Sequence, residues 1–120
     1  MRVTMLQAKL HRVRVTHADL DYEGSCGIDA DLISAAGLRT HQYIDIYNVA
    51  NGERFSTYII RATAGSGEIS LNGAAARLVA IGDPLIICAY SSYETAELDT
   101  YSPVVVLVDE RNRIKELKRT

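Results

Sequence analysis

Turn-forming residues recur along the middle of this chain and leave only short apolar stretches between them. The strongest turn signals contain glycine: Asn51–Gly52, Gly65–Gly67, Asn72–Gly73 and Gly82–Pro84. The stretches between these turns are rich in valine, isoleucine and aromatic residues, which favour strands over long helices. Many short strands separated by turns are typical of a small β-barrel, so we expect a mainly β fold with short helices.

The expected strands follow apolar runs and period-2 alternation. They cover residues 2–17 (one or two strands), 42–49, 53–62, 69–71, 85–90 and 104–109. Alternation in the first of these stretches places Lys9 and His11 on one face, about 7 Å apart along the strand. Asn51–Gly52 predicts a type I′ hairpin turn, in which both central residues have positive φ.

The remaining segments are expected to be a short helix, a loop and a loose tail. Asp29 is a typical N-cap, and Gly37 suits the position after a helix, so a helix is predicted over residues 30–36. Residues 18–28 are rich in glycine, small and acidic residues and predict a loop. The charged run from Glu110 to Thr120 predicts a frayed end.

Composition limits the classes of function. The 120 residues form one domain, and 13 Lys+Arg against 15 Asp+Glu leave no basic excess for general nucleic-acid binding. No apolar run reaches the ~18 residues that cross a bilayer, and the N-terminus lacks a signal-peptide core, so we expect a cytoplasmic protein. Two cysteines and three histidines argue against a disulfide framework or a structural zinc site.

Three sites carry possible chemistry. Gly24–Ser25 is either an ordinary turn or a self-processing site, in which the Ser25 hydroxyl attacks the Gly24 carbonyl. Arg54 and Tyr58 share a strand face, either as a carboxylate clamp and an acid or as ordinary surface residues. The small residues of 72–76 would let backbone N–H groups approach a ligand, or would simply pack tightly. Cys26 has no histidine partner that the sequence can place, and Cys88 suits a buried position.

Together these pieces resemble the pyruvoyl-dependent aspartate 1-decarboxylases. The matching strings, in chain order, are MLQAKLHRVRVTHADLDYEGSC, NGERFSTY, NGAAA, GDPLIICAY and PVVVLVDERN. The resemblance implies a six-stranded double-psi β-barrel and a homotetramer with active sites between subunits. It also implies that domain 1–120 cleaves itself between Gly24 and Ser25, giving a short chain 1–24 and a longer chain 25–120. A maturation protein assists this step in some relatives.

The implied reaction converts L-aspartate to β-alanine and CO₂, for pantothenate synthesis, through a Schiff base with a pyruvoyl group derived from Ser25; no metal is implied. The resemblance implies that Ser25 and Tyr58 are catalytic, with Tyr58 as the proton donor. It implies that Thr57 assists cleavage and also binds substrate. The other implied substrate-binding residues are Lys9, Arg54, Asn72, Gly73, Ala74 and Ala75. Tyr22 lies beside the cleavage point in the same motif.

Two positions depart from the family pattern, which often has histidine at Asp21 and at Arg77. These departures bear on local charge and pH dependence rather than on the reaction. Two alternatives stay open at this point. The chain could be an unprocessed barrel that serves as a binding module, or a pyruvoyl enzyme acting on another dicarboxylic amino acid such as glutamate.

Overall fold

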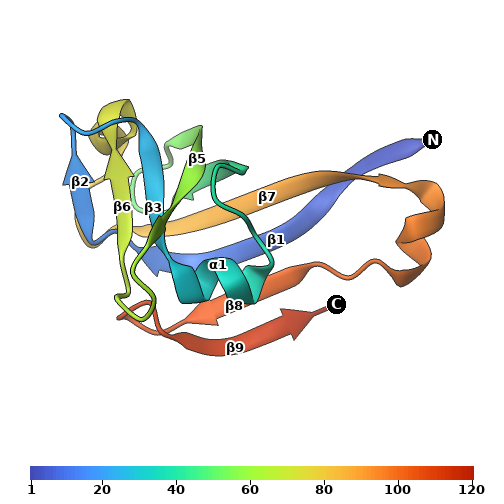
Figure 1. The fold of residues 1–120 in the computed structure, drawn as a ribbon. Helices are drawn as coiled ribbons and strands as arrows, with labels where there is room; N and C mark the ends of the chain where they lie inside the picture. The colour runs from blue at the N-terminus through green and yellow to red at the C-terminus, as the bar shows by residue number, and fades with distance from the viewer.

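The computed structural model describes all 120 residues, Met1 to Thr120, and most of them lie in strands (Figure 1). The strands are β1 (Arg2–Arg14), β2 (His17–Asp19), β3 (Ser25–Asp29), β4 (Tyr43–Asn48), β5 (Arg54–Ala62), β6 (Ile69–Asn72), β7 (Pro84–Glu94), β8 (Val104–Val108) and β9 (Ile114–Arg119). The helices are α1 (Ala30–Ala36) and two 3₁₀ segments, η1 (Gly73–Leu78) and η2 (Thr95–Thr100). None of these helices is long and apolar enough to pass through a membrane.

The sheet closes into a ring of six strands. Its strand order is β2-β6-β3-β5-β4-β7-β1-β8-β9. β1 and β2 are one run of chain interrupted only at residues 15–16. β2, at the start of this order, is therefore the continuation of β1, the seventh strand, and the sheet closes on itself. The Thr16 amide donates a hydrogen bond to the Ile69 carbonyl at 2.8 Å, at the point where β1 continues into β2. The predicted mainly β, six-stranded double-psi barrel with short helices is therefore confirmed, and β8 and β9 extend the sheet beyond the ring.

The barrel interior is filled by alternate side chains from every strand of the ring. Twenty buried apolar residues form one continuous cluster, and branched aliphatic side chains occupy most of its volume. The largest include Leu10, Ile28, Ile44, Ile46, Ile59, Ile69, Leu71, Leu85 and Ile87. The alternate positions on each strand consequently face outward, and the candidate residues Lys9, Ser25, Arg54, Tyr58 and Asn72 occupy such positions, whereas Thr57 shares the inward side with Ile59.

Two expectations about irregular segments are wrong. Residues 25–28, predicted as part of a loop, belong to the fully buried strand β3, which lies between β5 and β6. The tail is not frayed, since residues 114–119 form β9 and pair with β8. All side chains of β9 are exposed, so backbone hydrogen bonds rather than apolar periodicity form this strand.

Local sequence signals predicted the helix correctly and the hairpin turn only in part. The Asp29 side chain accepts a hydrogen bond from the Asp31 amide at 2.8 Å, and Gly37 ends α1 with φ of 69°. In the β4–β5 hairpin only Gly52 has a positive φ, 78°, so the turn is not type I′. The Asn48 amide donates to Glu53, and Asn48 receives the Gly52 amide, which makes a longer loop than predicted.

Asn112 locks the β8–β9 turn onto the barrel end. It is 2% exposed and has φ of 62°, a conformation that asparagine tolerates. Its side chain accepts a hydrogen bond from the Arg14 amide at 2.8 Å and donates to the carbonyls of Arg14 and Gly67 at 2.9 and 2.8 Å. Gly67 also donates its amide to Asp29 at 2.8 Å, so one polar network joins four separate segments.

Replacing Asn112 by alanine should destabilise the fold by about 2–4 kcal/mol, because it leaves one buried amide and two carbonyls without partners. Chemical denaturation followed by circular dichroism measures this change. Asn51→Ala is the matched control, since Asn51 also makes two side-chain hydrogen bonds but is exposed. Equal losses in the two variants would contradict the structural role given to Asn112.

Candidate active site

Ser25, the first residue of β3, is buried at the edge of the barrel. It is 1% exposed, and its register partner on β6 is Asn72, itself 6% exposed. The Asn72 Nδ2 group donates to the Ser25 hydroxyl at 3.0 Å. The hydroxyl in turn donates to the Glu23 carbonyl at 3.3 Å, one peptide upstream of the Gly24 carbonyl. Ser25 is thus a desolvated hydroxyl next to a flexible glycine, with an amide donor already bonded to it.

The segment after Asn72 packs directly on the backbone of the Gly24–Ser25 pair. Gly73 has φ of 69°, and a Cβ atom placed there would lie 2.8 Å from the Gly24 Cα and 3.3 Å from the Tyr22 carbonyl. Only glycine allows this approach. Ala74 and Ala75 follow in the first turn of η1, with Ala74 exposed. The structure therefore brings the 72–75 segment and the predicted cleavage point together.

Strand register places Thr57 and Tyr58 beside the same point. β5 runs parallel to β3, with Ile59 opposite Cys26. One residue earlier on both strands, Tyr58 is level with Ser25 and points outward like it, and Thr57 precedes Tyr58 on β5. Tyr58 is 38% exposed. Thr57 and Tyr58 line a cavity of about 580 Å³ together with Tyr43, Ser56 and His41.

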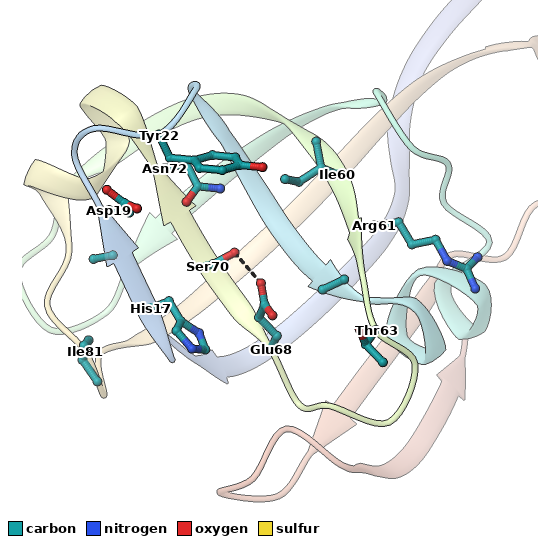
Figure 2. A pocket seen from close by; sticks show the side chains of 12 residues that line it. His17, Asp19, Tyr22, Ile60, Arg61, Thr63, Glu68, Ser70, Asn72 and Ile81 are labelled. Carbon is teal, nitrogen blue, oxygen red and sulfur yellow. Dashed lines mark hydrogen bonds between the residues drawn. The ribbon is translucent and has the colours of Figure 1, made fainter.

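A second cavity, of about 640 Å³, lies over β2, β6, β3 and β5 (Figure 2). In this view Tyr22 and Asn72 lie at one end, and Glu68 and His17 at the other. Ser70 donates to Glu68 at 2.9 Å, in space that Gly27 leaves open.

Most residues of this second cavity were missed by sequence reasoning. Its lining includes His17, Asp19, Ile60, Glu68 and Ser70, none of which was a candidate. The alternation of β6 alone could have placed Ser70 on the same face as Asn72.

Lys9 and Arg54 lie on another part of the outer surface. Arg54 begins β5, four residues and roughly 13 Å along the strand from Tyr58. Lys9 lies on β1, ten residues before Asp19, the residue of the same ring strand that is level with Asn72 and Ser25. Both face Cys88 of β7, where burial raises the pKa of the thiol and the two positive charges oppose that rise. Within one chain, therefore, Lys9 and Arg54 gather near each other but not around Ser25.

The cysteines and histidines that could act as nucleophiles or metal ligands give weaker evidence for a site. Burial raises the pKa of the Cys26 thiol to about 12, so this cysteine is protonated at neutral pH. Burial, together with the charges of Lys9, Arg12 and Lys118, lowers the pKa of His11. No group of three or more His, Cys, Asp or Glu side chains is placed to hold a metal ion.

Comparison with known proteins agrees with this geometry. The family model for aspartate decarboxylase matches residues 1–115. The chain is 61% identical to the aspartate 1-decarboxylase of Cupriavidus taiwanensis over 119 residues, 99% of both chains. It is 61% identical to that of Ralstonia pickettii over 120 residues, 100% of both, and 62% identical to that of Methylococcus capsulatus over 114 residues, 95% of this chain and 90% of the relative.

Among solved structures, the rationally designed protein mkDPBB_sym_86 is similar with a TM-score of 0.48 and 15% identity, over 64% of this chain and 90% of that one. That similarity is too low to carry an argument. The family match instead covers nearly the whole chain, including the Gly24–Ser25 pair, the Thr57–Tyr58 pair and the Asn72–Ala75 segment. This chain belongs to the aspartate decarboxylase family.

Proposed function

We propose that this chain decarboxylates L-aspartate to β-alanine and CO₂, using a pyruvoyl group made from its own Ser25, and so supplies β-alanine for pantothenate synthesis. Family membership supports the reaction. The observation that carries the assignment of the site is the buried Ser25 hydroxyl, bonded to Asn72 at 3.0 Å and preceded by Gly24. Removal of CO₂ leaves an electron pair that no standard side chain can accept, and the pyruvoyl carbonyl supplies that sink.

The residues around Ser25 fit such a group. The Asn72 amide already donates to the oxygen at this position, and Asn72 itself lines the cavity of about 640 Å³. Gly73 leaves no side chain between the 72–75 segment and the chain at Gly24. These features need no rearrangement of the barrel to accommodate a ketone in place of the serine.

Self-cleavage would begin when the Ser25 Oγ turns from the Glu23 carbonyl onto the carbonyl carbon of Gly24. A bond forms between these two atoms, the Gly24–Ser25 C–N bond breaks, and the proton passes to the Ser25 nitrogen, giving an ester. Loss of the Ser25 Cα proton then breaks the Cβ–O bond and releases chain 1–24 with a carboxylate at Gly24. Water finally replaces the nitrogen, which leaves as ammonia, and chain 25–120 begins with the pyruvoyl group.

Thr57 and Tyr58 take separate tasks in this proposal. Thr57 lies two residues before Ile59, the β5 partner of Cys26, and its hydroxyl would stabilise the oxyanion that forms during cleavage and would later contact substrate. Tyr58 is level with Ser25, points outward and would protonate the carbon that has lost CO₂. The backbone of Asn72, Gly73, Ala74 and Ala75 would line the other side of the substrate.

The distribution of cations supports a site shared between copies of the chain. Lys9 and Arg54 would hold the substrate carboxylates, yet neither lies beside Ser25 in a single chain. Arg54 is four residues along β5 from Tyr58, and Lys9 is ten residues before Asp19, which is level with Ser25. A neighbouring copy that presents its Lys9 and Arg54 to Ser25 would complete the site, as expected for a homotetramer. Two unpaired cysteines, Cys26 and Cys88, suit the reducing cytoplasm, which we propose as the location.

Ser25→Ala should abolish cleavage and decarboxylation together, because it removes both the nucleophile and the precursor of the cofactor. Intact mass under denaturing conditions should show one uncut chain, against two fragments that meet between Gly24 and Ser25 in the natural protein. Ser34→Ala, on the exposed face of α1, is the control and should be cut normally. Incubation of the natural protein with and without cell extract distinguishes spontaneous from assisted cleavage. Release of CO₂ by the Ser25→Ala variant would refute the proposed mechanism.

Gly73→Ala should slow cleavage strongly, because the new methyl group would press on the Gly24 Cα at 2.8 Å. The time course of fragment formation by mass spectrometry measures this effect. Gly52→Ala is a matched control, since Gly52 also has a positive φ, 78°, but a Cβ there meets no atom within 4 Å. If both variants were cut at the natural rate, the contact with Gly24 would have no part in maturation.

Arg54→Ala should lower kcat/KM for aspartate about tenfold or more, since a charge-assisted hydrogen bond contributes roughly 1.5–3 kcal/mol. Steady-state CO₂ release with aspartate, and with glutamate in parallel, measures both the loss and the substrate preference. Arg39→Ala, in the exposed loop after α1, should leave the kinetics unchanged. An unchanged kcat/KM in the Arg54 variant would remove this residue from substrate binding.

A further inference from the structure

Arg54 is held by an aromatic ring rather than by a carboxylate. Tyr47 of β4 is its cross-strand partner, and the guanidinium carbon Cζ lies 4.1 Å from the centroid of the Tyr47 ring. This distance is well within the range of a cation–π interaction. Both ion pairs of the chain involve Glu94, so no acidic side chain competes for the Arg54 guanidinium. Its N–H donors stay available while the ring fixes its plane.

The ring is itself anchored at its far end. The Tyr47 hydroxyl lies 3.0 Å from the hydroxyl of Tyr90 on β7. This hydrogen bond, with burial and a contact to Cys88, keeps the pKa of Tyr90 above its ordinary value. The Tyr90 hydroxyl is therefore protonated at neutral pH. The Tyr47 ring is tied to β7 through this hydroxyl, and Arg54 covers its face.

We propose that Tyr47, tethered by Tyr90, is a positioning residue that orders the Arg54 guanidinium for the substrate carboxylate. This inference rests on the proposed function of Arg54 in aspartate binding. An arginine ordered in advance loses less conformational freedom when it binds a carboxylate, so the free energy of substrate binding improves. Tyr47 acts through the Arg54 guanidinium and has no part in cleavage or proton transfer in this proposal, so the effect should fall on KM and spare kcat.

The first test compares kcat and KM for aspartate in fully cleaved Tyr47→Leu, Tyr47→Phe and Tyr90→Phe. Tyr47→Leu should raise KM about three- to tenfold, in keeping with a partly desolvated cation–π contact, and should leave kcat within about twofold. Tyr47→Phe and Tyr90→Phe keep the ring but loosen it, so each should raise KM by less. Tyr93→Phe, in the part of β7 remote from Arg54, is the control for loss of a tyrosine hydroxyl.

A double-mutant cycle separates positioning from a direct role of Tyr47. In an Arg54→Ala background, adding Tyr47→Leu should change KM by less than about 1.5-fold, because no guanidinium is left to order. An equal fold-change in both backgrounds, or no change in KM in Tyr47→Leu alone, would overturn the proposal.

Failure of the underlying function has a different signature. Natural protein that forms no pyruvoyl fragment would refute the proposed function before Tyr47 is considered. An Arg54→Ala variant with a normal KM would remove Arg54 from substrate binding and the positioning role of Tyr47 with it. A raised KM in Arg54→Ala, with an independent Tyr47 effect, would refute only the positioning role.

A second measurement keeps the test open if Tyr47→Leu does not fold or mature. Phenylalanines with increasing fluorination can be placed at position 47, since they keep the ring shape while removing the negative charge of its face. KM should rise stepwise with fluorination at constant kcat. A flat series would show that the ring does not hold Arg54 through its π face.

Discussion

The pairing of β3 between β6 and β5 fixes everything that the site needs. This five-residue strand has hydrogen-bonded neighbours on both sides, and its register sets residue 25 opposite Asn72 on one side and level with Tyr58 on the other. The inward side chains Cys26 and Ile28 anchor the strand in the core, so the outward position of Ser25 follows from alternation alone. A shift of one residue would turn Ser25 into the core and expose Cys26.

The outer surface of the barrel is divided into two chemically different regions. One contains Ser25, the proposed nucleophile, with small residues and the Asn72 amide donor around the start of β3. The other, across β1, β7, β4 and β5, contains Lys9, Arg54 and the ring of Tyr47. A decarboxylase of an acidic amino acid needs both regions at one substrate. Their separation within the chain is the reason that the proposed active site lies between two copies.

Sequence reasoning succeeded where the signal was local. Asp29 and Gly37 bound the helix from both ends, and alternation predicted the long strands. It missed β3, because the run from Ser25 to Asp29 has only two inward apolar side chains, Cys26 and Ile28, and owes its burial to strand residues 33 to 47 positions further along. The exposed β9 gave no apolar pattern at all. The Tyr47–Arg54 contact was within reach, since the hairpin around residues 48–53 implies this pair, whereas the distance from Lys9 to Ser25 depends on ring closure.

The order of strands in the ring gives the proposed cleavage a consequence for folding. Residues 1–24 carry β1 and β2, which together form one of the six ring strands and pair with β7, β8 and β6. A short product cut after Gly24 would therefore stay embedded, as a strand donated by a separate chain. Before the cut, the barrel assembles from a single molecule. Afterwards, reassembly from denatured pieces is a bimolecular reaction that depends on concentration. The mature barrel would therefore persist because it unfolds slowly rather than because it refolds readily.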